Sequence, residues 1–118
     1  MYPDLVRRFV RGGSELLTTI TNDAWFGKTS APYQHFAQAS MRAIEEGRYL
    51  VRSANTGVCG IVDPYGRVLA STRTFEPAVT VGDIRFLKTP TIYSRIGDVF
   101  AYASALLTVA LLVRRGNV

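Results

Sequence analysis

A strand that stops abruptly at a polar loop is the feature that most constrains the fold of this chain. Residues 15–21 form an apolar and β-branched run of the length expected for a strand covered on both faces. Asn22 and Asp23 end this run, and the loop that follows carries Trp25 and Phe26. Two large aromatic side chains in a loop need an apolar partner, which is the protein's own core, another domain, a ligand or lipid.

Helical patterns lie on both sides of this strand. Pro3 and Asp4 are favoured in a first helical turn, and apolar residues recur at helical spacing from there to Gly12. A second helix is predicted over residues 32–46, with small and aromatic side chains along one face. The strand is therefore expected to pack against helices.

Short strands and tight turns occupy the middle of the chain. Residues 49–54 predict a second strand, and residues 58–62 and 67–71 predict a hairpin joined by the type I turn sequence DPYG. Residues 78–84 predict a fifth strand at the edge of the sheet. The order of one strand, one helix and three or more strands indicates an α/β or α+β layered fold.

Length and charge argue against a multidomain protein and against a nucleic-acid-binding protein. The 118 residues form at most one domain, and the net charge of +5 is scattered along the chain. No basic run with interleaved aromatics marks a nucleic-acid surface, so no nucleic-acid partner is expected. Five arginines flank apolar segments, which favours an anionic membrane surface as the partner: Arg7, Arg8, Arg11, Arg114 and Arg115.

Neither the single cysteine nor the single histidine predicts a reactive site. Cys59 alone excludes an internal disulfide and a cysteine-rich zinc site, and its place inside the hairpin favours a buried small hydrophobe over a nucleophile. His35 has no second ligand at metal-binding spacing, which favours a structural or solvated role. No metal, cofactor or nucleophile–base pair is predicted.

The C-terminal segment is a long uncharged run. Residues 99–113 carry no charge and are followed by Arg114 and Arg115. A helix of this length spans only about 22 Å, which lies between a core helix and a membrane span. The terminal arginines favour a transmembrane helix with a cytoplasmic C-terminus. The predicted division is therefore a domain over 1–87, a linker over 88–97 and a transmembrane helix over 98–115.

Residues 16–70 resemble the C-terminal half of the nitrilase-type catalytic domain of the apolipoprotein N-acyltransferases, in the carbon–nitrogen hydrolase superfamily. The shared blocks occur in the family's order: NDAWFG at 22–27, APYQH at 31–35, MRAIE at 41–45, NTG at 55–57 and DPYG at 63–66. The resemblance implies the C-terminal part of a nitrilase-like αββα sandwich, followed by one transmembrane helix. It also implies a place in the bacterial inner membrane, with the catalytic-domain part facing the periplasm.

The family's activity follows only as an implication of this resemblance. Such enzymes transfer a fatty acyl chain from a phospholipid to the N-terminal diacylglyceryl-cysteine amine of an apolipoprotein, through a thioester on the cysteine of a Glu, Lys and Cys triad. The sequence has no Cys-Tyr-Glu nucleophile motif, and Cys59 lies in the hairpin rather than before the first helix. We therefore expect a fragment that is inactive without the missing N-terminal half of the enzyme.

The resemblance implies supporting roles for residues of this chain. Asn22 and Asp23 would hold the loop, and Arg42 and Glu45 would make structural salt bridges rather than bind substrate. Six residues are expected to contact substrate or shape its pocket: Asn22, Asp23, Trp25, Phe26, Asn55 and Gly57. Two alternatives remain, a noncatalytic membrane-anchored interaction module and a fragment of a nitrilase-superfamily amidase, although the apolar terminal helix argues against the second.

Overall fold

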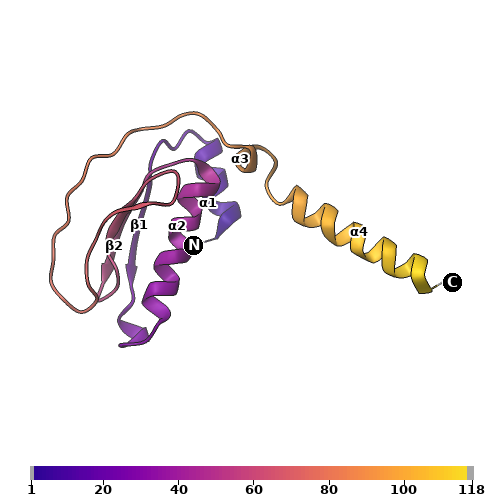
Figure 1. The fold of residues 1–118 in the computed structure, drawn as a ribbon. Helices are drawn as coiled ribbons and strands as arrows, with labels where there is room; N and C mark the ends of the chain where they lie inside the picture. Colours follow the sequence, from indigo (N-terminus) through magenta and orange to yellow (C-terminus); the bar gives the residue numbers. More distant parts are fainter. Residues whose placement is uncertain (1, 117–118) are drawn as a thin grey trace.

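The computed structural model describes residues 2–116 and has a sheet packed beside helices (Figure 1). The sheet has four strands in the order β1-β2-β3-β4. This arrangement confirms the mixed α/β class that the sequence predicts. The elements in chain order are α1 (Pro3–Arg11), β1 (Leu17–Asn22), the 3₁₀ helix η1 (Ala24–Phe26), α2 (Ala31–Glu46), β2 (Leu50–Asn55), β3 (Gly60–Val62), β4 (Val68–Ser71), α3 (Ile92–Ile96) and α4 (Val99–Gly116).

The first two strands are parallel and set the direction of the sheet. They pair in register from Leu17 opposite Leu50 to Asn22 opposite Asn55. Parallel neighbours need a crossover connection, and α2 supplies it. α2 ends at Gly47, whose left-handed backbone, with φ of 62°, suits a residue without a Cβ. The carboxyl ends of β1 and β2 therefore meet at the same end of the sheet.

The core lies between the sheet and the helices α1 and α2. Ala39 and Ala43 on α2 are fully buried, and such small side chains allow the helix to approach the sheet closely. On the opposite face Ile20 is 89% exposed, so the prediction that β1 is covered on both faces is wrong for the described residues. The buried cluster comprises Val6, Val10, Leu17, Ala39, Ala43, Leu50 and Val62, with Phe36 packed against it.

The predicted hairpin and its DPYG turn are confirmed. β3 and β4 pair antiparallel, and the Gly66 amide donates to the Asp63 carbonyl across the turn. The Asp63 carboxylate also accepts hydrogen bonds from the Tyr65 and Arg67 amides, both at 2.9 Å. This turn chemistry is local, which is why the sequence alone identifies it.

The predicted fifth strand over residues 78–84 is wrong. The segment has no regular structure and runs as a long loop around the sheet (Figure 1). Val79 and Val81 are 92% and 87% exposed. β-branched residues favour a strand through packing on neighbouring strands, and these two valines find no apolar surface to pack on.

The predicted linker over residues 88–97 contains a short helix, α3. The Thr91 hydroxyl caps it by accepting a hydrogen bond from the Ser94 amide at 2.9 Å. The same hydroxyl donates to the Glu45 carbonyl at the end of α2. The segment therefore contacts the end of α2, and a threonine at the N-cap is the sequence signal for the short helix. The division into a domain, a linker and a terminal helix stays a prediction.

The uncharged C-terminal run forms the helix α4, which extends away from the rest of the structure (Figure 1). Every described side chain from Val99 to Arg115 is exposed. Across residues 2–116, no helix combines the length and the apolar character needed to cross a membrane. The helix is confirmed, and the predicted span is unconfirmed.

We expect Glu46→Gln to stabilise the folded chain near neutral pH. Glu46 is fully buried, and burial raises its pKa above the ordinary value of 4.5, although Ser94, Arg7, Arg48 and Arg42 oppose the rise. Because the pKa of Glu46 is higher in the folded chain than in the unfolded chain, the folded chain holds this proton more tightly. The free energy of unfolding therefore falls as the pH rises between these two pKa values. The increase in the free energy of unfolding that Glu46→Gln produces should therefore be largest above the pKa of Glu46 in the folded chain, and it should vanish in acid.

Urea unfolding of the full chain in detergent, followed by circular dichroism across this pH range, would measure the effect of Glu46→Gln. Glu76→Gln is the matched control because Glu76 is exposed. Equal effects of the two substitutions at every pH would contradict the assignment of the pH dependence to Glu46.

Candidate functional site

Polar side chains gather where β1 and β2 end. Asn22 and Asn55 are register partners, and the Asn55 side-chain amide donates to the Asn22 side-chain oxygen at 3.1 Å. The Asn22 oxygen also accepts from the Ala24 amide at 3.1 Å, which fixes the start of the next loop. We call the strand ends and the loops that follow them, residues 22–30 and 55–59, the carboxyl edge. Ligands of open α/β sheets commonly bind at such an edge.

Asp23 is the centre of a buried ion-pair cluster at this edge. Its carboxylate is fully buried, and Oδ2 accepts a hydrogen bond from the Arg52 guanidinium at 2.9 Å. Oδ1 lies 2.9 Å from Nδ1 of His35 and 3.4 Å from the Thr21 hydroxyl. Asp23 therefore ties the end of β1 to α2 through His35 and to β2 through Arg52.

Gly57 lies directly against the Asp23 carboxylate. A Cβ at this position would lie 2.2 Å from Asp23 Oδ2, which no side chain could tolerate without displacing the cluster. The preceding residue, Thr56, has a left-handed backbone with φ of 59°, which is uncommon for a residue other than glycine. The NTG turn is thus shaped to let the chain pass close to Asp23.

The aromatic loop faces outward from this anchored base. Trp25 is 86% exposed and Phe26 is 44% exposed, so the alternative that both rings pack into the core is wrong. The Phe26 ring stands edge-on to the His35 ring, with centroids 6.2 Å apart. His35 therefore connects the buried cluster to the exposed aromatic pair.

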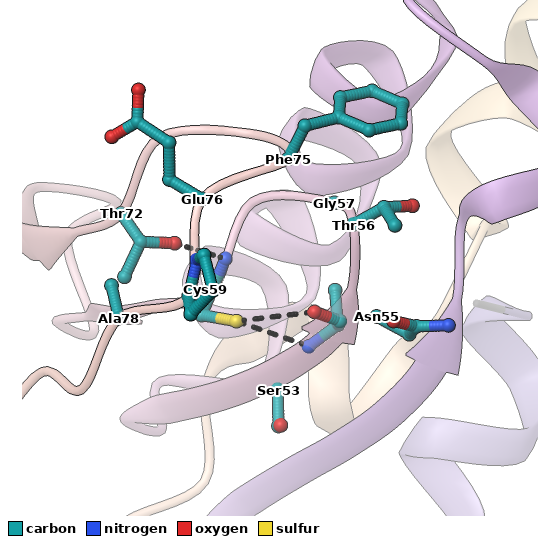
Figure 2. A pocket seen from close by; sticks show the side chains of 11 residues that line it. Ser53, Asn55, Thr56, Gly57, Cys59, Thr72, Phe75, Glu76 and Ala78 are labelled. Carbon is teal, nitrogen blue, oxygen red and sulfur yellow. Dashed lines mark hydrogen bonds between the residues drawn. The ribbon is translucent and has the colours of Figure 1, made fainter.

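Cys59 lines a cavity of about 410 Å³ at the carboxyl edge (Figure 2). Its thiol accepts from the Ala54 amide at 3.2 Å and donates to the Ala54 carbonyl at 3.4 Å, and the Cys59 amide donates to the Thr72 hydroxyl. Cys59 is half-buried rather than fully buried, which corrects part of the prediction. Its bonds to Ala54 are those of a structural thiol, and none of its hydrogen bonds to the described residues is to a base.

A second cavity, of about 360 Å³, lies between the aromatic loop and the segment after β4. The Tyr33 hydroxyl lies 3.3 Å from the Thr74 hydroxyl, and the Lys28 ammonium lies 5.8 Å from the centre of the Phe75 ring. Phe75 and Glu76 line both cavities, so the two are neighbours along one surface.

The structure brings together most of the residues that the sequence singles out. Asn22, Asp23, Asn55 and Gly57 meet at the carboxyl edge, and Trp25 and Phe26 project from it. The structural salt-bridge role predicted for Arg42 and Glu45 is confirmed, since the two pair with each other at 2.7 Å. Sequence reasoning missed Arg52 and the Asp23 contact of His35. A sequence signal for Arg52 does exist. Every second residue of a strand faces the same side, so Arg52 shares the buried face of Leu50 on β2, and a buried arginine needs an acidic partner.

Among the described residues, no group of three or more histidine, cysteine or carboxylate side chains could hold a metal ion. The carboxyl edge instead offers amide groups, a buried carboxylate and exposed aromatic rings. Such a surface can bind an apolar chain and position neighbouring polar groups.

Comparison with known proteins identifies related sequences. A family model for carbon–nitrogen hydrolases matches residues 1–89. A protein from Geobacter metallireducens named apolipoprotein N-acyltransferase is 46% identical over 121 residues, which cover 100% of this chain and 23% of that protein. Proteins of the same name are 48% identical over 84% of this chain in Bradyrhizobium diazoefficiens and 41% identical over 92% of it in Thermotoga maritima. The aligned segments span 18% and 22% of those two proteins, so this chain covers less than a quarter of each relative.

Proposed function

Because this chain belongs to the carbon–nitrogen hydrolase family, we propose that its carboxyl edge forms one wall of the acyl-transfer site of an apolipoprotein N-acyltransferase. The observation that carries this proposal is the exposed pair Trp25 and Phe26, held at the end of β1 by the buried Asp23 cluster. Exposed aromatics on a rigid base suit contact with a fatty acyl chain.

The reaction has two steps in the proposed mechanism. A cysteine thiol gives up its proton and attacks the ester carbonyl of a phospholipid as the thiolate. The ester C–O bond breaks, a thioester forms, and the lysophospholipid leaves with the proton that the thiol gave up. The α-amine of the diacylglyceryl-cysteine at the apolipoprotein N-terminus then attacks the thioester, so an amide forms and the thiol is released. The chain lacks the Cys-Tyr-Glu motif, and the reacting thiol would come from a segment outside this sequence.

The residues of this chain would bind and position rather than react. Trp25 and Phe26 would contact the acyl chain, and Asn22 and Asn55 would hold the two strand ends in register. Asp23 would act as a positioning residue, because its contacts are with His35 and Arg52 and it is closed to solvent. On its own the chain would be inactive.

The same proposal places the protein at the bacterial inner membrane, with the exposed apolar helix α4 against lipid. The partners would be a phospholipid acyl donor, an apolipoprotein N-terminus and the missing part of the enzyme. A periplasmic catalytic part and a cytoplasmic C-terminus remain predictions.

Exchange of this chain for the aligned residues of the Geobacter relative would test the proposal. We expect the hybrid to transfer acyl chains to a lipoprotein, and we expect the Cys59→Ser hybrid to do so equally well. The isolated 118-residue chain, incubated with a phospholipid that carries a labelled acyl chain, should form no thioester. A stably produced hybrid without activity would contradict the proposal, as would acylation of Cys59 that is lost in Cys59→Ser.

A further inference from the structure

A strongly basic cavity lies at the opposite end of the parallel strands from the carboxyl edge. It measures about 470 Å³ and includes Gly13, which precedes β1, and Arg48, which precedes β2. Four cationic side chains line it and none of its lining residues is acidic; the four are Arg11, Arg48, Lys88 and Arg95.

Arg48 forms a fixed cation in this cavity. Its side chain is buried, and its guanidinium donates to five backbone carbonyls, those of Ser14, Glu46, Gly47, Lys88 and Thr89. No carboxylate of the described residues lies within 4 Å of it. Backbone carbonyls thus hold the charge in place. The carboxylates that attract it, Glu46 and Glu15, are not among the residues that line the cavity, so the four lining cations leave a positive potential there.

Two further cations are free to meet a ligand. Arg11 and Arg95 are exposed, and neither has an ion-pair partner among residues 2–116. Among the described residues, Lys88 is the one lining cation with an ion-pair partner, and its ammonium lies 3.3 Å from the Glu15 carboxylate. Arginine binds phosphate through paired N–H donors, and two guanidinium groups border this cavity. The cavity therefore offers the hydrogen-bond donors that the oxygen atoms of a phosphate accept.

The cavity borders the start of the apolar helix. Arg95 is on α3, and α4 begins soon afterwards at Val99. The Arg7 guanidinium lies against Gly97 in the connection between them, where a Cβ would overlap it. An exposed apolar helix that leaves from a basic surface is the arrangement expected at the headgroup layer of a membrane.

We propose that this cavity binds the phosphate of an anionic lipid headgroup while α4 contacts the acyl region. The site would stand whether or not the carboxyl edge takes part in acyl transfer. Free inorganic phosphate has the same chemistry, and the experiment must therefore separate a lipid from a soluble anion.

The test is binding of the full chain to phosphatidylcholine vesicles with and without phosphatidylglycerol, measured by flotation. We expect phosphatidylglycerol to increase the affinity of the chain for the vesicles. Arg11→Gln and Arg95→Gln should each lower the affinity for the phosphatidylglycerol vesicles roughly five-fold. Arg73→Gln is the matched control, because it removes the same charge from an exposed site after β4 and should leave binding unchanged. Circular dichroism should be the same for all variants.

Two results would overturn the proposal. An equal loss for Arg73→Gln and Arg95→Gln would mean a general attraction of a basic protein to an anionic surface. Calorimetric binding of inorganic phosphate that depends on Arg11 and Arg95, without any difference between the two kinds of vesicle, would assign the cavity to a soluble anion instead of a lipid.

Discussion

Asp23→Ala is expected to lower the free energy of unfolding by roughly 3–5 kcal/mol. The substitution leaves the Arg52 guanidinium without its carboxylate partner inside the protein, where the Arg52 side chain is 1% exposed. It also removes the acceptor for His35. A buried cation without a partner is costly because it has lost both water and the opposite charge.

A loss of this size is a large part of the stability of a small domain, which is typically about 5–15 kcal/mol. Urea unfolding of the full chain in detergent, followed by circular dichroism, would measure it. Arg73→Ala is the control because its ion pair with Glu76 is exposed and 3.9 Å long, so its effect should stay within about 0.5 kcal/mol.

The loss of unfolding free energy caused by Asp23→Ala should depend on Arg52. In an Arg52→Met background the unpaired cation is absent, and Asp23→Ala should cost less by roughly 0.5–3 kcal/mol. Equal costs of Asp23→Ala in the two backgrounds would contradict the view that the ion pair is the reason for the loss.

Local sequence signals predict much of this fold. The DPYG turn, the helix that ends at Gly47 and the strand that ends at Asn22 each depend on residues close in sequence, and each is confirmed. The candidate site is predictable in part for the same reason. The turn and loop motifs follow strand ends, so the parallel register of β1 and β2 brings them together.

The remaining features depend on contacts between distant segments. The pairing of Asp23 with Arg52 joins two residues that are 29 positions apart in the sequence, and no local pattern specifies it. The valines of residues 78–84 have strand propensity but meet no neighbouring strand. The exposure of Trp25 depends on how the loop leaves the sheet, which explains why the core and the surface were both open alternatives.

The two candidate surfaces lie at opposite ends of the β1–β2 pair. A six-residue strand spans about 20 Å, so the basic cavity and the carboxyl edge are separate sites rather than parts of one pocket. Substitutions in one should leave the other unaffected, which allows lipid binding and acyl transfer to be tested independently.

Trp25→Ala tests the central claim that the aromatic loop forms a wall of the acyl-transfer site. Burying a large apolar side chain against a ligand contributes about 1.5–3 kcal/mol, which corresponds to roughly ten- to a hundredfold in rate. Because Trp25 is 86% exposed, the substitution should not change the stability of the protein. Tyr65→Ala is the matched control, since Tyr65 is also an exposed aromatic, 79% exposed, but lies in the DPYG turn.

The most direct measurement is kcat/KM for acyl transfer by the hybrid with the Geobacter relative, compared with its Trp25→Ala and Tyr65→Ala variants. We expect Trp25→Ala to lower kcat/KM roughly ten- to a hundredfold and Tyr65→Ala to leave it unchanged. A Trp25→Ala hybrid that is as active as the unsubstituted hybrid would contradict the assignment of the carboxyl edge to the acyl-transfer site.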